Sequence, residues 1–164
     1  MHSRLPAKHK PHVGPKCAVV ARGTPRLCER IKQLADLCRG ELGFVVRAWI
    51  LDSVRRQAVF VARSADGHII GFVEFRHRRD KVTKLYRICT HPAWRLRGIG
   101  KMQIDELVRD CRVHHQRAIV LLCPMGLPAN GFYAARGFVN TATRDGRRLG
   151  LLEWKMAITS PTRS

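Results

Sequence analysis

The chain has 164 residues, with 31 Lys and Arg against 12 Asp and Glu, which gives a formal net charge of +19. A chain of this length usually folds as one domain, and the hydrophobic content of 45% excludes wholesale disorder. No stretch approaches the roughly 20 apolar residues that a membrane span needs, and residues 1–16 have no apolar segment of the kind found in a secretory signal. We therefore expect a cytoplasmic protein with no membrane partner.

Hydrophobic periodicity divides the chain into an arm, a domain and a tail. Residues 1–16 are basic, rich in proline and without periodicity, so a flexible basic N-terminal arm is expected there. Residues 17–156 are expected to form a single domain, and residues 157–164 a C-terminal tail. Apolar residues that alternate or recur every three to four positions predict strands at 17–21, 57–63, 68–77, 82–90, 118–123, 138–143 and 147–157, and helices at 25–39, 45–54, 98–116 and 129–136.

The predicted order is β-α-α-β-β-β-α-β-α-β-β, which indicates a mixed α/β sheet with three antiparallel meander strands and one βαβ unit. The strand at 118–123 is apolar throughout, a pattern typical of burial on both faces. Asp66-Gly67 predicts a hairpin turn, and Gly137 is expected just beyond the end of the last helix, at C′.

Neither the cysteines nor the histidines indicate a metal site. The six cysteines contain no C-x-x-C pair and no zinc-finger spacing, and most have apolar neighbours, so we expect them in the core. His114 and His115 stand at the predicted end of a helix, where a cationic side chain suits the helix dipole. No metal is therefore predicted.

The most informative segment, residues 88–101, reads ICTHPAWRLRGIGK. It is the end of a strand, then a proline-containing turn, then a glycine-bearing loop that opens a long helix. Backbone N–H groups in the first turn of a helix lack internal partners, and the helix dipole adds partial positive charge there. Gly98 and Gly100 allow close backbone approach, and Arg95 and Arg97 can donate charge-assisted hydrogen bonds. The segment therefore predicts a diphosphate site.

Two common phosphate motifs do not fit this loop. A dinucleotide fingerprint requires a third Gly or an Ala where Gln103 stands, and a P-loop requires Ser or Thr where Met102 stands. The pattern Arg95-x-x-Gly98-x-Gly100 after a proline-ended strand instead resembles the acetyl-CoA loop of the GNAT superfamily of N-acetyltransferases, whose pattern is Q/R-x-x-G-x-G/A.

A second segment resembles the same family. Residues 129–138, ANGFYAARGF, are similar to its A-x-x-F-Y-x-x-x-G-F segment, and the order of strands and helices also matches. The resemblance covers about residues 17–156. It implies a GNAT-like acyl-CoA N-acyltransferase fold and an enzyme that moves the acetyl group of acetyl-CoA directly to a primary amine.

The resemblance also implies roles for individual residues. Ile88, Cys89 and Thr90 would pair their backbone with the pantetheine arm of acetyl-CoA. Tyr133 would act as the general acid that protonates the departing thiolate. Gly126 stands where many family members carry an Asn that contacts the cofactor. The residues that would wrap the pyrophosphate are Arg95, Leu96, Arg97, Gly98, Ile99, Gly100 and Lys101.

The general base is left open. Many family members carry a glutamate on the fourth strand, whereas residues 82–90 contain no carboxylate. Glu74 on the preceding strand is one candidate, directly or through water, and a salt bridge with nearby arginines is its alternative role. His91 is another candidate, although a His-Pro pair can serve only to shape the turn. An α-amino acceptor with a pKa of about 8 is also partly neutral without any strong base.

The charge bears on the choice of acceptor. Arg144, Arg147 and Arg148 cluster on the last predicted hairpin, beside the expected acceptor groove. We therefore expect an anionic or neutral amine acceptor in preference to a polycation. Two alternatives stay open: a basic RNA-binding module on a GNAT fold, and an acetyltransferase that acts on an RNA-linked or ribosomal amine.

Overall fold

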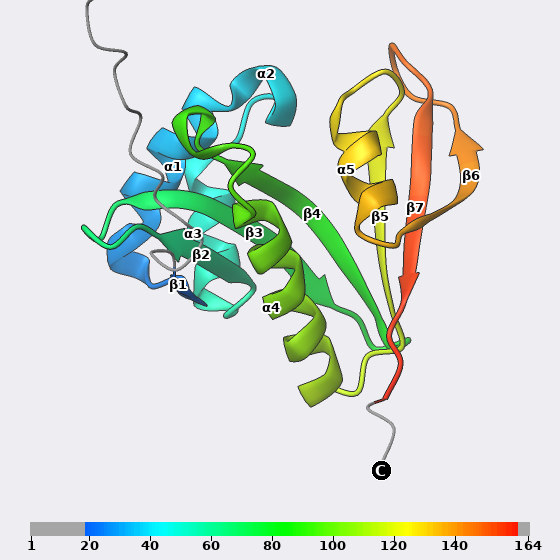
Figure 1. Cartoon of the computed structure of the whole chain (residues 1–164), viewed down its shortest axis with the longest axis horizontal. Coiled ribbons are helices and arrows are strands. Elements are labelled where there is room, and N and C mark those ends of the chain that lie inside the picture. Colours follow the sequence, from blue (N-terminus) through cyan, green and yellow to red (C-terminus); the bar gives the residue numbers. More distant parts are fainter. Residues whose placement is uncertain (1–18, 161–164) are drawn as a thin grey trace, which may run out of the picture.

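The computed structural model describes residues 19–160, in which seven strands form one mixed sheet (Figure 1). The strand order across the sheet is β1-β2-β3-β4-β5-β7-β6. The predicted arm at 1–16, the start of the predicted first strand and residues 161–164 of the tail lie outside the described residues. The strands are β1 (Val19–Arg22), β2 (Val59–Arg63), β3 (Ile69–His77), β4 (Val82–Thr90), β5 (Ala118–Pro124), β6 (Val139–Arg144) and β7 (Leu151–Ala157).

Helices cover both faces of this sheet. Helices α1 and α3 pack on one face against Val59, Val61 and Phe72, whereas α4 packs on the other against Phe60 and Val73. This alternation along β2 and β3 is the period of two that a strand buried on both faces requires. None of the helices between residues 19 and 160 is long and apolar enough to cross a membrane. The helices are η2 (Pro25–Leu27), α1 (Cys28–Leu37), α2 (Arg39–Leu42), α3 (Arg47–Arg55), η3 (Pro92–Trp94), α4 (Ile99–Val113) and α5 (Ala129–Ala135).

The predicted meander and βαβ unit are both present. Strand β2 pairs antiparallel with β3, and β3 pairs antiparallel with β4, so these strands are neighbours in the sheet in their chain order. Helix α4 connects β4 to the parallel strand β5. Gly67 has φ +80 in the turn between β2 and β3, and Gly137 has φ +91 just after the end of α5. Both glycines therefore occupy the left-handed conformation for which they were predicted.

Strands β4 and β5 form a splayed pair. Their parallel pairing extends only from Val82↔Ala118 to Lys84↔Val120, after which the two strands diverge. Beyond that point β5 is paired instead with β7, as far as Pro124↔Leu151. The result is a V-shaped opening between the carboxyl ends of β4 and β5, with α4 leading from one arm to the other (Figure 1).

Two local expectations are wrong. Strand β5 is not buried along its whole length: Leu122 is 39% exposed, on the face opposite to Ile119, Leu121 and Cys123, which pack in the core with residues of α4 and α5. The first predicted helix is also not continuous. It starts as the 3-10 turn η2, and after α1 the chain forms the single turn α2, which includes Gly40 and ends at Gly43 with φ +71. The expectation of core cysteines is confirmed for five, which are buried and free of disulfides: Cys28, Cys38, Cys89, Cys111 and Cys123.

Candidate active site

Strand β4 bends where it leaves β5. Two adjacent residues of β3, Glu74 and Phe75, face Arg87 and Leu85, so β4 carries one extra residue at this point. Such a bulge bends a strand and increases its twist. The segment Ile88–Thr90 follows the bulge and is hydrogen-bonded to β3, whereas β5 does not pair with it. One backbone edge of the segment therefore faces the opening of the V.

The loop after this segment brings backbone N–H groups together at the start of α4. The Nδ1 atom of His91 accepts a hydrogen bond from the N–H of Ala93 (3.1 Å), which stabilises the turn η3. Leu96 and Gly98 both have left-handed backbone, with φ +60 and +81, and Gly98 is the N-cap of α4. Since the first N–H groups of a helix have no partner within it, this turn has the geometry of an anion site.

The basic side chains of the loop are engaged with other groups of the chain. Arg95 forms an ion pair with Glu41 of α2 (2.6 Å) and also donates from Nε to the carbonyl of Thr90 (3.3 Å). The Arg97 guanidinium stacks over the Trp94 ring, 5.1 Å from its centroid, and Lys101 forms an ion pair with Asp105 (2.6 Å). The backbone N–H groups are therefore the freer donors of this loop.

Gly100 is explained by packing between helices. A Cβ atom at this position would lie 3.0 Å from two ring carbons of Phe132 on α5. Almost any side chain at position 100 would push α5 away from the start of α4. The second glycine of the loop motif therefore holds α4 and α5 together.

Tyr133 is buried on α5, at the side of the opening that β5 forms. Its ring makes edge-on contacts with Phe132 (5.5 Å between centroids) and Phe138 (5.6 Å). Burial raises the pKa of the Tyr133 phenol well above its ordinary value, and the neighbouring Cys123 adds to the shift. The phenol is therefore protonated at neutral pH, which is the state that a proton donor needs.

A carboxylate network lies on the α3 side of the sheet. The Glu74 side chain is 8% exposed, and one of its oxygens accepts a hydrogen bond from Ser53 Oγ (2.5 Å). The other oxygen forms an ion pair with Arg87, whose guanidinium lies 5.6 Å from the centre of the Trp49 ring. Trp49 is 54% exposed, so the network reaches solvent at the end formed by Arg87 and Trp49.

Comparison with known proteins agrees with this geometry. Residues 29–138, more than half of the chain, match the model of the acetyltransferase (GNAT) family. The chain belongs to the GNAT acetyltransferase family. The matched range includes the splayed strand, the anion-site loop and Tyr133, and it ends at Phe138. No curated protein matches the chain.

Solved GNAT structures share the fold at low sequence identity. Ard1 from Thermoplasma volcanium superposes with a TM-score of 0.79 at 19% identity, over 88% of this chain and 99% of that one. The ribosomal-protein-S18-alanine N-acetyltransferase from Escherichia coli gives 0.74 at 11% identity, over 88% and 96%. A putative acetyltransferase of Salmonella typhimurium, yncA, solved with acetyl-CoA, gives 0.74 at 16% identity, over 90% and 97%.

Asn130 anchors α5 beside the candidate site, and sequence reasoning did not single it out. Its amide donates to the carbonyls of Pro124 (2.9 Å) and Leu127 (3.0 Å), and its oxygen accepts from Nε1 of Trp154 (2.9 Å). Asn130 thereby ties α5 to the end of β5 and to the middle of β7. Gly126, in the same connection, has φ +83, a conformation that Asn also tolerates, which accounts for either residue at this position.

Two cysteines form a pair beneath the loop, which their spacing in sequence did not indicate. The pKa of Cys38 is lowered to about 7, first by a hydrogen bond with the Cys89 thiol and further by Arg95, against the effect of burial. Burial raises the pKa of the Cys89 thiol. Cys38 follows α1 and Cys89 lies on the splayed strand, so the pair joins the α1–α2 connection to the edge of the opening.

Proposed function

We propose that this GNAT protein transfers the acetyl group of acetyl-CoA directly to a primary amine. The observation that supports it best is the continuity of the unpaired edge of Ile88–Thr90 with the N-terminal turn of α4. An extended amide-containing arm can pair with such a strand edge, and a diphosphate attached to that arm would then meet the N–H groups of the turn. Acetyl-CoA carries both groups in this order.

Each part of the cosubstrate has a proposed place. Ile88, Cys89 and Thr90 pair with the pantetheine arm, and the pyrophosphate is bound by the loop. Because the side chains of that loop have partners within the chain, its backbone N–H groups carry most of the binding. The proposed pyrophosphate-binding residues are Arg95, Leu96, Arg97, Gly98, Ile99, Gly100 and Lys101.

The proposed reaction is a single displacement. The neutral amine attacks the thioester carbonyl, so that a C–N bond forms and the C–S bond breaks. A backbone N–H group of the splayed strand stabilises the oxyanion of the intermediate. Tyr133 donates its phenolic proton to the departing CoA thiolate and acts as general acid. The proton that the amine nitrogen loses replaces the one that Tyr133 gives to the thiolate, so the phenol is restored and no proton is gained or lost overall.

Glu74 is proposed to position Arg87 for the acceptor. Both oxygens of its carboxylate are engaged, by Ser53 and Arg87, which favours the salt-bridge role over that of a base. His91 uses Nδ1 as an acceptor within the turn η3, in keeping with a role in shaping the loop. The proposal therefore relies on the neutral fraction of an acceptor amine with a pKa of about 8.

The acceptor is proposed to be an anionic or neutral amine. Arg87 and Trp49 form a cationic and aromatic surface on the acceptor side. Arg147 and Arg148 are exposed in the connection between β6 and β7, whereas Arg144 is paired with Glu153 (2.5 Å). Within residues 19–160 Arg147 and Arg148 form no ion pair, and their guanidinium groups favour an acceptor that carries a carboxylate or phosphate.

A screen with radiolabelled acetyl-CoA tests the proposal. The acceptors are small amines, polyamines, peptides with free N-termini and aminoacylated tRNA. Transfer to an amine is expected, with acidic acceptors ahead of polyamines. Binding of RNA that weakens steeply with salt, in a protein that does not bind CoA, would favour the RNA-binding alternative and overturn the proposal.

A further inference from the structure

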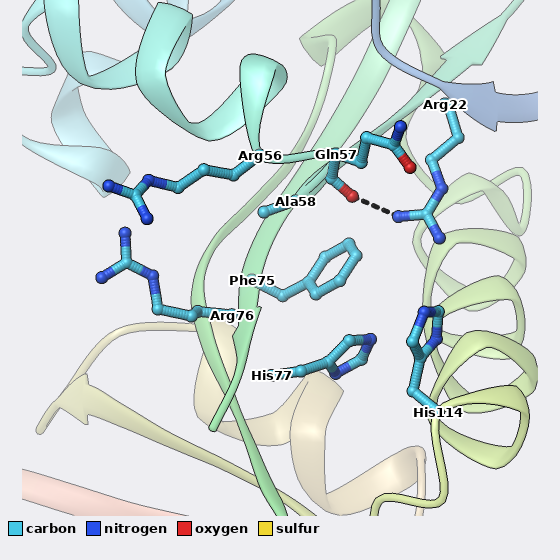
Figure 2. A pocket seen from close by; sticks show the side chains of 8 residues that line it. All are labelled: Arg22, Arg56, Gln57, Ala58, Phe75, Arg76, His77 and His114. Atoms are coloured by element: carbon cyan, nitrogen blue, oxygen red, sulfur yellow. Dashed lines mark hydrogen bonds between the residues drawn. The ribbon is translucent and has the colours of Figure 1, made fainter. Parts of the chain in front are cut away.

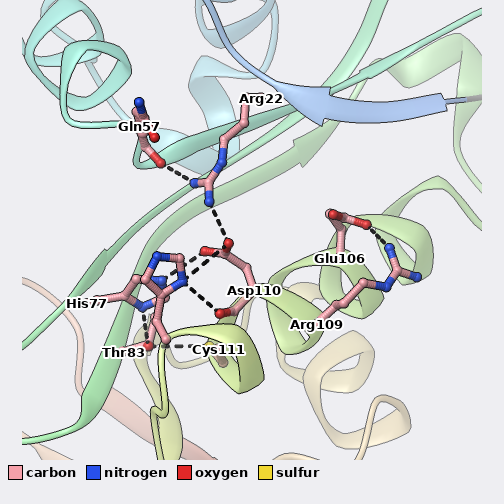
Figure 3. Close-up of polar contacts among 9 residues, drawn as sticks. Arg22, Gln57, His77, Thr83, Glu106, Arg109, Asp110 and Cys111 are labelled. Atoms are coloured by element: carbon pink, nitrogen blue, oxygen red, sulfur yellow. Dashed lines mark hydrogen bonds and ion pairs between the residues drawn. The ribbon is translucent and has the colours of Figure 1, made fainter.

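A second cluster of polar side chains lies at the other end of α4, away from the anion-site loop. His77 is the last residue of β3, and Asp110 and His114 lie on the C-terminal turn and C-cap of α4. Figure 3 shows Asp110 at the centre of this network, with contacts from β1, β3 and α4. The acetyl-transfer chemistry proposed above uses none of these residues.

The donor atoms of the three side chains converge. His77 Nε2 lies 2.8 Å from Asp110 Oδ2, and His114 Nδ1 lies 3.5 Å from Asp110 Oδ1. The two imidazole rings are 4.6 Å apart between centroids, and one donor atom from each residue lies within 4.8 Å of the others. Ligand atoms about 2.0–2.1 Å from a tetrahedral ion are separated by about 3.3 Å. Because the donor atoms lie within 4.8 Å of one another, side-chain shifts of up to about 1.5 Å would place all three around one ion.

Neighbouring groups orient these side chains as outer-shell partners orient metal ligands. The Thr83 hydroxyl lies 2.8 Å from His77 Nδ1, which leaves Nε2 of that ring to face Asp110. Arg22 forms an ion pair with Asp110 Oδ1 (2.5 Å), so that Oδ2 is the oxygen turned towards His77. Hydrogen bonds to the second imidazole nitrogen and to the second carboxylate oxygen fix ligand orientation in metal sites.

The cluster opens into a cavity of about 410 Å³, which gives an ion and its water ligands access from solvent. Figure 2 shows His77 and His114 side by side at one end of this cavity. Asp110 is 8% exposed, whereas the His114 side chain is 46% exposed. The cavity is also lined by Arg22 and Gln57. The Arg22 guanidinium donates a hydrogen bond to the backbone carbonyl of Gln57.

The ligand set selects a class of ion. Calcium and magnesium prefer six or more oxygen ligands, whereas imidazole nitrogen suits zinc, nickel, cobalt and copper. A carboxylate and a histidine four residues apart on a helix lie on one face, as Asp110 and His114 do. The guanidinium of Arg22 opposes any cation and limits the affinity, but it occupies one oxygen only.

We propose that His77, Asp110 and His114 form a binding site for a divalent transition-metal ion of the zinc type. His114 Nδ1 also lies 2.9 Å from the backbone carbonyl oxygen of Asp110, so the ion displaces two hydrogen bonds, this one and the one between His77 Nε2 and Asp110 Oδ2. It is bound by His77 Nε2, Asp110 Oδ2 and His114 Nδ1, with water completing the coordination. It links the end of β3 to the C-terminal turn of α4, the helix whose other end carries the anion-site loop.

Zinc titration by calorimetry on the full chain tests this site. His114→Ala is the principal variant, because this side chain is the most exposed of the three and its loss leaves the Arg22–Asp110 ion pair intact. His115→Asn is the matched control: it removes the adjacent histidine, and Asn tolerates the left-handed backbone (φ +53) found there. We expect a zinc-binding event that is weakened at least tenfold in His114→Ala and unchanged in His115→Asn.

A second readout identifies the ligands. Cobalt bound by the proposed nitrogen and oxygen atoms gives visible absorption bands that His114→Ala loses, and zinc raises the Tm of the parent chain more than that of this variant. The proposal is overturned if no binding event depends on His114. It is equally overturned if cobalt shows the near-ultraviolet charge-transfer absorption of thiolate ligands, which would place the ion on cysteine.

Discussion

Glu74 and Arg87 face each other across β3 and β4, and their side chains form an ion pair at the bulge where the sheet begins to splay. Both residues lie largely out of solvent, with side chains 8% and 19% exposed. A carboxylate in this position is already committed to a cation and to the Ser53 hydroxyl. The same contact holds the Arg87 guanidinium 5.6 Å from the centre of the Trp49 ring, on the side proposed for the acceptor.

The first prediction concerns Glu74→Gln. Because Gln can still accept the hydrogen bond from Ser53 but cannot neutralise Arg87, we expect the free energy of unfolding to fall by about 1–3 kcal/mol. With an acceptor found by the acetyl-transfer screen, KM for the acceptor should rise while kcat falls by less than about tenfold. Denaturant unfolding and steady-state kinetics measure the two effects.

The pH profile separates the two roles of Glu74. A positioning role leaves the pH dependence of kcat unchanged, since Glu74 then takes no proton from the acceptor. A fall of kcat by about 100-fold or more, at unchanged KM and with loss of the acidic limb of the profile, would identify Glu74 as the general base.

The second prediction concerns the anion site at Gly98, which has φ +81 and open space where a Cβ would stand. Gly98→Asp places a carboxylate against the proposed pyrophosphate, and CoA affinity should fall by about 100-fold or more. Gly98→Asn is the matched control, because Asn has the same size, no charge and tolerance of left-handed backbone. Its affinity should fall by less than about tenfold. Equal losses in calorimetry would mean that shape, not charge, limits binding here.

The third prediction concerns Tyr133→Phe. The ring keeps its edge-on contacts with Phe132 and Phe138, so CoA affinity and Tm should change little. The loss of the proton donor should lower kcat by about 100-fold. Because burial raises the pKa of this phenol, the parent enzyme should not lose activity through Tyr133 up to about pH 9. Equal turnover by the two forms would leave Tyr133 a packing residue only.

Much of the fold could be predicted from patterns within short stretches of the sequence. Alternation in β2, β3 and β4 and the helical period of α4 depend on residues close in sequence, and the turn glycines Gly67 and Gly137 have a purely local conformational reason. The splay of β4 from β5 depends instead on where two distant strands stop pairing. A single chain contains no direct signal for that register.

The parts of the candidate site that could not be predicted from the sequence depend on contacts between distant segments of the chain. Arg95 reaches Glu41 on α2, and Asn130 reaches Trp154 on β7, so neither partner can be read from spacing. The cluster at the end of α4 had one local signal, the four-residue spacing of Asp110 and His114. Its third member, His77, is 33 residues from Asp110 in the chain and became visible only once β3 and α4 were placed together.

The fourth prediction tests the packing reason for Gly100. Gly100→Ala would place its Cβ 3.0 Å from two ring carbons of Phe132, which would have to move by a few tenths of an ångström. Overpacking of this kind costs about 1–3 kcal/mol, which exceeds the gain in helix propensity of about 1 kcal/mol. The free energy of unfolding should therefore fall by about 1 kcal/mol, as measured by denaturant unfolding.

Gly131→Ala is the matched control on the opposing helix. Gly131 lies inside α5, and no atom lies within 4 Å of the Cβ position there. Only helix propensity then acts, and Ala should stabilise the protein by about 0.5–1 kcal/mol. Opposite signs for the two substitutions are expected because one glycine is held by a contact and the other is not. If both stabilise the protein, α5 moves freely enough to accept a methyl group, and the glycine at position 100 serves the anion site instead.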